Sequence, residues 1–324
     1  MLEYWQLLDW LAQYSLDYGL KFHRRPWFVR PPDFPDHTVY CDLRFEGRVY
    51  FGLGHSTNAR LAHAIAAAEA LERVGMASLK LHNSNGCAVH MDEARAQRGA
   101  LSELVERDAF LCHYYTGTAL ARLPEKLHGR LRVMKELATS HGWTLEAGVM
   151  SNALGLPSVM VAMKGAGRDP LRGMFTGLGL AEEWSVALEK ALGECWRFAD
   201  SDMADATALQ SITMDEFIAL KEKSVKEHIR LSADPVFGEA VWQRFFPHGE
   251  TVNAIEVGLL ERTTFQTFPL KTIFKDCPLI FAQAQNPGLA PVGFGGRWKE
   301  SLKHPRYSFF STRGADIDWP HGMG

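Results

Sequence analysis

The spacing of apolar residues along the chain predicts three long helices, each preceded by a turn that contains glycine. Apolar side chains recur with the period of an α-helix over about 58–74, 92–115 and 183–199. A glutamate follows the turn glycine after 15–17 residues in each case, the pairs being Gly54 and Glu69, Gly86 and Glu103, Gly179 and Glu194. Such self-similarity indicates an internal repeat. We therefore predict an α/β protein with three repeated units of a strand, a glycine turn and a helix.

Alternation of apolar and polar residues predicts the strands. A hairpin is expected over 38–51, with its turn at Glu46 and Gly47. Paired strands are expected at 158–164 and 173–177, where apolar residues form two short runs, and a last strand is expected at 278–283, with a proline at its start.

The other segments are predicted to be a helix, a linker, an insertion and a tail. Residues 4–14 show helical spacing, and four prolines make 23–37 an extended linker. The moderately charged helical pattern of 205–250 indicates a peripheral helical insertion. The stretch 293–324 is rich in Gly and Pro and indicates an ordered irregular tail rather than a helix. No clean boundary is visible, so a single domain over 1–324 is expected.

The composition excludes several classes of protein. The chain has 324 residues, 46% of them hydrophobic, and a net charge of −3, which allows a sizeable core and argues against a protein that coats nucleic acid. Its five cysteines form no CxxC pair, so neither a disulfide framework nor a zinc ribbon is expected. The N-terminus lacks the pattern of a signal peptide, and no apolar run is long enough to span a membrane. We therefore expect a soluble, cytoplasmic protein.

The first two repeat helices share the motif ExxER, at 69–73 and 103–107. On a helix the two glutamates share one face, and the arginine can pair with the first glutamate. A single motif of this kind is ordinarily a solvated helix face. Here it occurs twice, on helices that are apolar nearly all round, and buried carboxylates are costly unless they pair or hold a cation. Carboxylate oxygens suit Mg²⁺, which usually bridges carboxylates and substrate phosphates. The glutamates therefore indicate a site for Mg²⁺ and a nucleotide.

The glycine turns fit a phosphate site, because glycine lets the backbone N–H groups at the start of a helix approach an anion. Ser84-Asn85-Gly86 and 177–179 are the candidate turns. The chain has no GxxxxGK[ST] motif, and no GxGxxG motif follows a strand, so neither a P-loop nor a Rossmann site is supported. Four histidines do not repeat at metal-ligand spacing and are expected to be surface or core residues: His63, His82, His90 and His113.

These motifs resemble those of the YcaO family, over roughly 1–200 and 275–324. Residues 84–86 with 102–109 resemble the family's SNG…ELxERDA block, which is the most specific match. Further segments match as well. Residues 52–73 resemble the GKGxT turn with its ExxER helix, and residues 177–194 resemble the third glycine block with its helix. Residues 320–324 stand where the family usually ends in PHPFP.

The resemblance implies a YcaO-type fold with three repeated units around a central ATP site. It implies that a nucleophile attacks a backbone amide carbonyl of a ribosomally made peptide, and that the resulting oxyanion takes phosphate from ATP. The product would be an azoline, a thioamide or an amidine. Phosphoryl transfer depends mainly on positioning and charge neutralisation, which agrees with a cluster of glutamates.

The resemblance also assigns the site residues by position. As metal ligands it implies Glu69, Glu72, Glu103, Glu106 and Glu194. As contacts to ATP it implies Ser84, Asn85, Glu69, Glu72, Glu103, Arg107 and Glu194. As catalytic residues of the tail it implies His321 and Gly324. The expected partners are a peptide substrate with a leader and a separate protein that binds the leader or delivers sulfur. A homodimer is possible, and neither a membrane nor a nucleic acid is expected.

Two other functions remain open at the level of the sequence. The chain departs from the family's pattern at Leu53, Ile65, Arg197, Gly322 and Gly324, which leaves room for a non-catalytic scaffold or an accessory subunit of a peptide-modifying complex.

An RNA-binding protein is the second alternative, because 36–74 follows the order of a double-stranded-RNA-binding fold. Those domains hold RNA phosphates with a lysine cluster at the start of the helix. The corresponding stretch here, 55–60, has a single firm positive charge, Arg60.

Overall fold

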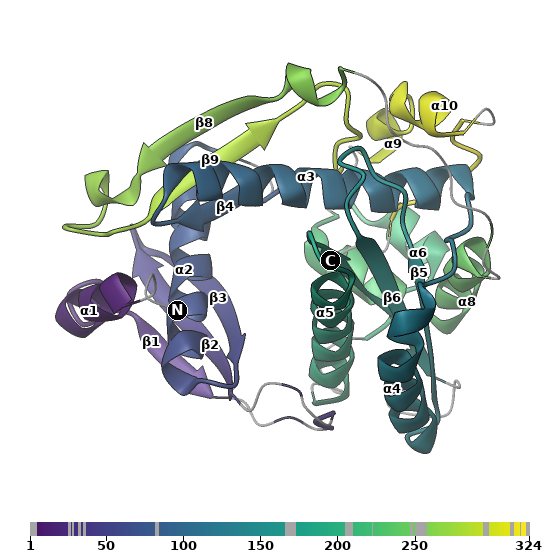
Figure 1. Ribbon diagram of the computed structural model, residues 1–324, viewed down its shortest axis with the longest axis horizontal. Coiled ribbons are helices and arrows are strands. Elements are labelled where there is room, and N and C mark those ends of the chain that lie inside the picture. Colours follow the sequence, from purple (N-terminus) through teal and green to yellow (C-terminus); the bar gives the residue numbers. More distant parts are fainter. Residues whose placement is uncertain are drawn as a thin grey trace. The chain divides into compact units, whose positions relative to one another are not determined.

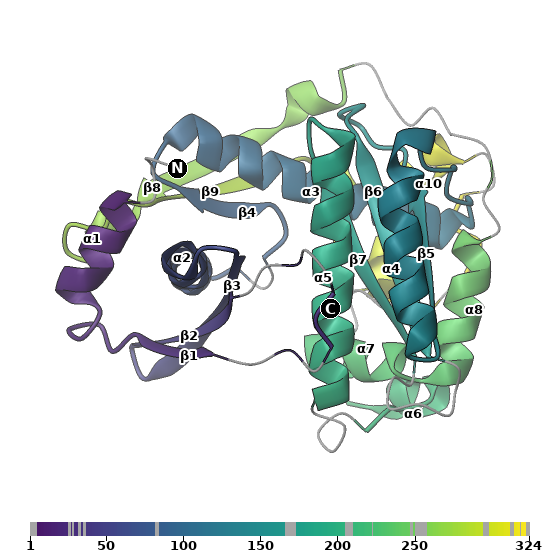
Figure 2. The ribbon, with the colours of Figure 1, turned by 60° about the horizontal axis from the view of Figure 1, so that its bottom comes forward.

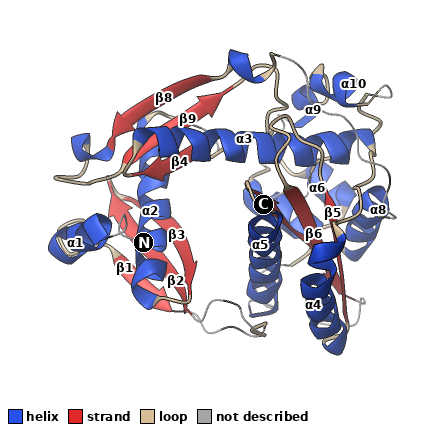
Figure 3. Ribbon diagram, viewed as in Figure 1, coloured by secondary structure: helices blue, strands red, loops and turns tan. Residues whose placement is uncertain are grey.

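The computed structural model describes residues 5–24, 27, 29–31, 34, 37–81, 84–165, 173–204, 210–221, 223–246, 249, 258–293, 298–311, 314–317 and 319–321. They belong to two compact units. Unit 1 comprises Met1–Leu104 and Thr263–Asn286, and unit 2 comprises Val105–Arg262 and Pro287–Gly324. Helix α3, Glu93–Thr116, contributes its first half to unit 1 and its second half to unit 2. Both units combine helices with antiparallel strands, which confirms the predicted α/β class (Figure 3).

Unit 1 contains a three-stranded antiparallel sheet with a long helix on one face (Figure 1). The strands lie in the order β1 (Lys21–Arg24), β2 (His37–Phe45) and β3 (Arg48–Ser56), and the helix is α2 (Ala59–Ser78). The side chain of Asn58 accepts the first free N–H groups of α2, which is why the helix begins there. The predicted hairpin and helix are confirmed. Strand β1 extends into the segment 23–37 that was predicted to be a linker, so that prediction is wrong for residues 23 and 24.

Glycine allows β3 to lie directly on α2. A Cβ atom at Gly52 would stand 2.0 Å from the carbonyl oxygen of Ala66, and one at Gly54 would stand 1.9 Å from that of Ala62. No side chain fits in such a space, so the approach requires glycine on the strand. The helix meets it with the small side chains that the sequence shows as an Ala-rich run.

The remaining elements of unit 1 are a second sheet, the start of α3 and an N-terminal helix. The second sheet is antiparallel in the order β4 (Cys87–His90), β9 (Ile280–Gln285) and β8 (Thr264–Pro269). Helix α1 (Trp5–Tyr14) places Trp10 against the ring of Phe274. A 3₁₀ turn, Leu270–Thr272, precedes that ring. Strand β9 confirms the predicted last strand, whereas β4 and β8 were not predicted.

Unit 2 contains a three-stranded antiparallel sheet that is covered on both faces. The strands lie in the order β5 (Trp143–Val149), β6 (Ser158–Gly165) and β7 (Met174–Leu180). Helices α4 (His128–Ser140) and α5 (Trp184–Ala204) pack on one face (Figure 2). The other face contributes side chains to a hydrophobic core that also includes residues of α3 and of α8 (Pro235–Phe245). Because both faces are covered, β6 reads as a nearly continuous apolar run in the sequence.

The contact between strand β7 and helix α5 repeats the contact seen in unit 1. A Cβ atom at Gly177 would stand 2.1 Å from the carbonyl oxygen of Ala191, and one at Gly179 would stand 2.0 Å from that of Ala187. Two of the three predicted repeats therefore share their packing. The third repeat is not confirmed: Gly86, with a φ of 70°, stands in a turn that leads into strand β4.

Short helices form the segments predicted as insertion and tail. Between 210 and 246 lie α6 (Met214–Ala219), α7 (Val225–Ser232) and α8. Phe237, Val241 and Phe245 of α8 are part of the core of unit 2, so this region is not peripheral as predicted. The tail forms α9 (Trp298–Ser301) and α10 (Arg306–Phe310), which corrects the prediction of a tail without helix. Burial of Arg306, Tyr307 and Phe310 stabilises α10. A 3₁₀ turn precedes α4 at Glu125–Leu127, and another stands at Leu260–Arg262.

Candidate functional site

In unit 1, Arg73 interacts electrostatically with three predicted site residues, Glu69, Glu72 and Glu103. Its Nη2 atom donates to Oε1 of Glu69 at 3.1 Å, as the ExxER spacing predicts. Burial lowers the pKa of Arg73, but the negative charges of Glu69, Glu72 and Glu103 outweigh it, so that the pKa is raised. Arg73 therefore stays protonated, and it offsets part of the mutual repulsion of these carboxylates.

The backbone of strand β3 holds the other oxygen of Glu69. The N–H of Leu53 donates to Oε2 at 2.8 Å, and Leu53 stands between the two glycines that allow β3 to lie on α2. A half-buried carboxylate with a charge-assisted hydrogen bond at each oxygen keeps a fixed orientation. The carboxylate of Glu69 is therefore positioned before any ligand binds.

A pocket in unit 1 opens beside this carboxylate. Its lining is apolar except for two glutamates and one histidine, and comprises Leu7, Ile65, Ala68, Glu69, Glu72, Val89, His90, Met91 and Leu279. The sequence predicts His90 to be an ordinary surface or core residue. Strand β4 places it here, and since that short strand was not predicted, nothing in the sequence placed His90 near the glutamates.

In unit 2, a second pocket brings together three predicted site residues from two separate parts of the chain. Glu106 and Arg107 come from α3, and Glu194 comes from α5. The rest of the lining comes from β7, α5 and α7, and comprises Met174, Phe175, Thr176, Leu178, Phe198, Ile229 and Ser232. None of these seven residues was predicted as a site residue, because the sequence predicts a strand at 173–177 and a helix at 183–199 but gives no signal that they meet at this pocket.

Glu194 is held in the same way as Glu69. The N–H of Leu178 in strand β7 donates to its Oε2 atom at 2.6 Å. Leu178 lies between Gly177 and Gly179, as Leu53 lies between Gly52 and Gly54, and in both units the donor precedes the glutamate by 16 residues. The two units therefore present a carboxylate by the same construction. The negative charge of Glu194 also contributes to a raised pKa of the Cys195 thiol, whose main cause is burial.

Ser84 and Asn85 lie in a turn of unit 1 rather than at the start of a helix. The carbonyl oxygen of Ser84 accepts the N–H of Cys87 at 3.1 Å, and strand β4 begins at that residue. The carbonyl of Gly86 accepts the N–H of Ala284 in strand β9 at 2.8 Å, which fixes the turn. The predicted role of this turn in phosphate binding stays a prediction.

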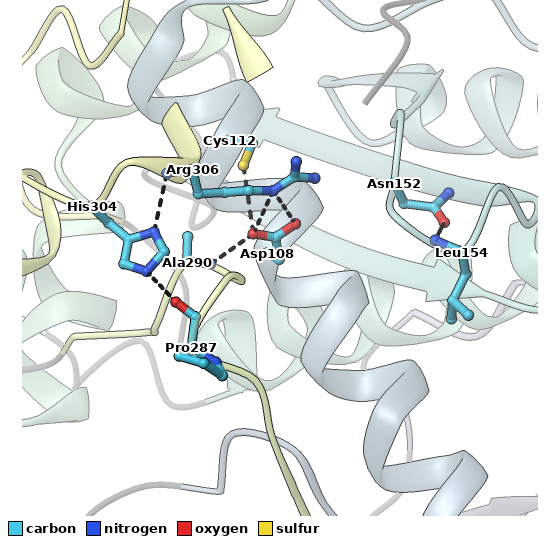
Figure 4. A network of polar contacts seen from close by, with 8 residues as sticks. All are labelled: Asp108, Cys112, Asn152, Leu154, Pro287, Ala290, His304 and Arg306. Atoms are coloured by element: carbon cyan, nitrogen blue, oxygen red, sulfur yellow. Dashed lines mark hydrogen bonds and ion pairs between the residues drawn. The ribbon is translucent and has the colours of Figure 1, made fainter. Parts of the chain in front are cut away.

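Directly after Arg107, Asp108 forms a buried ion pair that the sequence did not predict (Figure 4). Nε of Arg306 donates to both carboxylate oxygens of Asp108, at 3.2 and 3.1 Å. Oδ1 also accepts the N–H of Ala290 at 2.7 Å and a bond from Cys112 Sγ at 3.7 Å. The pair ties α3, beside Glu106 and Arg107, to the C-terminal part of unit 2.

The predicted tail residue His321 is fully buried in unit 2. Its Nε2 atom lies 3.0 Å from the carbonyl oxygen of Gly293, and its own carbonyl oxygen lies 2.7 Å from Nδ1 of His228. It is not among the residues that line the pocket of Glu106 and Glu194. Gly324, the other predicted catalytic residue, lies outside the described residues. The catalytic role of both stays a prediction.

The side chains that line the two pockets are suited to bind a magnesium ion that also contacts a phosphate. Both pockets offer carboxylate oxygens, the ligands that Mg²⁺ prefers, and the pocket of unit 2 adds the guanidinium of Arg107. Within the described ranges, no three His, Cys, Asp or Glu side chains gather closely enough to hold a metal by themselves. Mg²⁺ characteristically completes its coordination with water and substrate phosphates, so such a donor set suits it.

Comparison with known proteins decides the family. The sequence model described as YcaO cyclodehydratase, ATP- and Mg²⁺-binding, matches residues 74–246, a little over half of the chain. The chain belongs to the YcaO family. The matched range includes Glu103, Glu106, Arg107 and Glu194, but it begins after Glu69 and Glu72. A search of curated proteins found no match.

Solved structures share the YcaO fold with this chain. YcaO from Methanopyrus kandleri, bound with AMPPCP and Mg²⁺, matches 97% of this chain and 94% of its own with a TM-score of 0.59 and 12% identity. A heterocyclase in complex with substrate and cofactor matches 95% of this chain and 57% of its own, with a TM-score of 0.58 and 12% identity. The E. coli microcin synthetase McbBCD complex matches 83% of this chain and 88% of its own, with a TM-score of 0.55 and 12% identity. The predicted YcaO-type α/β fold is confirmed, without the third of its predicted repeats.

The same comparisons give no support to RNA binding. Residues 37–74 form β2, β3 and most of α2 in a YcaO fold, and the start of α2 carries Arg60 as its firm positive charge. As to membranes, none of the helices in the described part of the chain combines the length and the apolar composition needed to cross a bilayer.

Proposed function

We propose that this YcaO protein is an enzyme that uses ATP and Mg²⁺ to activate a backbone amide of a ribosomally made peptide, giving an azoline, a thioamide or an amidine. The observation that carries the proposal is the pocket of unit 2, where Glu106, Arg107 and Glu194 lie together. Two carboxylates and a guanidinium provide ligands for a metal and a positive charge for a phosphate, which phosphoryl transfer requires.

The residues of the chain act by binding and orientation. When bound, ATP would supply the phosphoryl group that the amide oxygen receives. Arg107 would contact the phosphates, and the glutamates of each pocket would supply oxygen ligands for Mg²⁺, whose coordination phosphate and water would complete. Leu178 keeps Glu194 in place through its N–H, and Leu53 and Arg73 keep Glu69 in place. Because these contacts exist before ligand binds, little reorganisation is needed when the nucleotide enters.

The partners follow from the same proposal. A peptide with a leader would be the substrate, and a separate protein would bind the leader or deliver sulfur. The microcin synthetase, which shares the fold, is a complex. Association of this chain with itself and residence in the cytoplasm complete the proposal.

The experiment is a calorimetric titration with Mg²⁺ and AMPPCP, a non-hydrolysable ATP analogue. We expect the wild-type protein to bind, and Glu103→Gln and Glu194→Gln each to weaken binding about tenfold or more, because each removes a charge worth about 1.5–3 kcal/mol in a hydrogen-bonded site. The control is Glu136→Gln, the same change at an exposed residue of α4 whose side chain is 70% accessible.

The outcomes separate the proposal from the alternatives. Binding that requires Mg²⁺ and is weakened about tenfold or more in both site variants, but not in the control, supports it. If the wild-type protein binds the nucleotide but never hydrolyses ATP in the presence of its peptide and partner, the chain is a non-catalytic scaffold. If the wild-type protein does not bind, the nucleotide site is absent and the proposal fails.

A further inference from the structure

We propose that His228 is a positioning residue that holds the C-terminal segment of unit 2, residues 314–317 and 319–321, against helix α7. It would thereby fix one wall of the pocket that contains Glu106 and Glu194. The inference rests on the proposed function, because it gives this pocket its role in binding Mg-ATP. It assigns a function to a helix in the region that the sequence suggested to be a peripheral insertion.

The first step is the contact between His228 and the C-terminal segment. Nδ1 of His228 lies 2.7 Å from the carbonyl oxygen of His321, so in the neutral ring this nitrogen carries the proton and donates it. The two imidazole rings stack, with centroids 4.9 Å apart and planes inclined by 29°. Burial lowers the pKa of His228, although the bond to His321 and the charge of Glu227 oppose the shift and Lys223 adds to it. The ring is therefore neutral at physiological pH.

The second step is that the segment is anchored at further points within unit 2. The hydroxyl of Tyr114 donates to the carbonyl oxygen of Pro320 at 2.9 Å. His321 contacts Gly293 through Nε2 at 3.0 Å, and Trp319 packs beside Phe237 with ring centroids 6.3 Å apart. The N–H of Asp316 donates to the carbonyl of Tyr115 at 2.9 Å. Bonds to two helices and a loop thus hold a segment in which Pro320 and His321 are buried, Trp319 is half-buried and Asp316 is exposed. The bond from His228 is the contribution of α7.

The third step is that α7 also forms the pocket. Ile229 and Ser232 line it, and Ser232 Oγ donates to the carbonyl oxygen of His228 at 3.1 Å. Helix α7 has only eight residues, a length at which an isolated helix is not stable in water, so its position depends on tertiary contacts. One short helix therefore connects the C-terminal segment to the pocket wall, and His228 is the polar contact that joins them.

The experiment compares variants of His228 in the full chain. His228→Phe keeps a ring of similar size that can stack on His321 but removes the donor, whereas His228→Asn removes the ring but keeps an N–H near the position of Nδ1. The control is His128→Phe, which removes another histidine contact to a backbone carbonyl in unit 2, the 3.1 Å contact of His128 Nε2 with Leu123. Each variant is titrated with Mg²⁺ and AMPPCP, and circular dichroism verifies its folding.

We expect His228→Phe to weaken binding about tenfold, which is about 1.4 kcal/mol. His228→Asn should restore most of it, and His128→Phe should bind as the wild type does. Linkage requires the reverse effect as well. Mg-AMPPCP should slow amide hydrogen exchange at 314–317 and 319–321 in the wild type, and this protection should disappear in His228→Phe. A residue that merely stabilises the fold would not make the exchange of the segment depend on the nucleotide.

Two results would overturn the inference. In the first, the wild type binds Mg-AMPPCP and a folded His228→Phe variant binds it with the same affinity and shows the same protection of the segment from amide exchange. If that variant does not fold, Tyr114→Phe replaces it, because this change removes the hydroxyl that donates to the carbonyl oxygen of Pro320. An unchanged affinity and unchanged protection in Tyr114→Phe would equally refute the connection between the segment and the pocket. A wild type that does not bind Mg-AMPPCP contradicts the proposed function, and this inference fails with it.

Discussion

Replacement of Arg306 by methionine tests whether the buried ion pair holds unit 2 together. Asp108 is 0% exposed and Arg306 is 1% exposed, so the methionine would leave a carboxylate out of contact with water and opposite an apolar side chain. Asp108 would keep the N–H of Ala290 but would lose the two bonds from Arg306. Removing one partner of a buried pair costs about 3–5 kcal/mol. We expect a loss of this size in the free energy of unfolding.

The loss should depend on pH, because the carboxyl of Asp108 can escape the penalty by taking up a proton. Burial already raises the pKa of Asp108 against the opposing effect of Arg306, and the variant loses that opposition. A carboxyl whose folded pKa exceeds its unfolded value of about 3.9 binds more protons when folded, so it destabilises the protein increasingly as the pH rises through the folded pKa. The deficit of the variant should therefore be smaller at pH 5 than at pH 7.5.

The assay is urea denaturation of wild type and variants at both pH values, followed by circular dichroism. The matched control is the double variant Asp108→Asn with Arg306→Met, which leaves no buried charge and keeps an oxygen for the N–H of Ala290. We expect the double variant to recover most of the loss at pH 7.5. If the single variant loses less than about 1 kcal/mol, or if the double variant is no better, the buried charge is not what makes the pair necessary.

Two further predictions concern unit 2. Burial lowers the pKa of His113 to about 4 in the folded protein, below the unfolded value of about 6.5. Its neutral form therefore contributes stability above pH 6.5, and this contribution, about 3 kcal/mol, should be lost as the pH falls from 6.5 to 4. The variant His113→Gln should flatten that part of the pH profile of urea unfolding. The variant Gly177→Ala would bring a Cβ atom to 2.1 Å from the carbonyl oxygen of Ala191 and should lower the free energy of unfolding by about 3 kcal/mol. In the control Gly193→Ala, on helix α5, the new Cβ meets nothing within 4 Å and should raise the free energy of unfolding by about 0.5–1 kcal/mol. Equal melting temperatures of the two variants would contradict the close packing.

The parts of the fold that the sequence predicted are those whose signals are local. The hairpin of β2 and β3 and the helix α2 follow from alternation, a Gly-containing turn and a long Ala-rich run. The pair of Glu69 and Arg73 follows from their spacing of four residues on a helix. In these cases the residues that decide the structure are neighbours in the chain, so a window of the sequence contains the whole cause.

The parts that were missed depend on residues far apart in the chain. The bonds between Asp108 and Arg306 join positions 198 residues apart, and nothing near Arg306 marks it as a buried residue. Helix α10 has five residues and is stabilised by packing, so its local pattern is too short to indicate a helix. His90 joins the glutamates of unit 1 because β4 pairs with β9, almost 200 positions later, a pairing set by tertiary structure.

The bonds from Leu53 to Glu69 and from Leu178 to Glu194 have a consequence for how the family can change over time. Strands β3 and β7 are the outermost strands of their sheets, and an N–H group on such a strand is a template on which another chain can pair and aggregate. Each glutamate occupies one of these donors. Loss of the carboxylate would therefore reduce solubility, whatever its effect on the proposed nucleotide site. Selection for solubility alone would preserve both glutamates, even in a descendant that had ceased to use ATP.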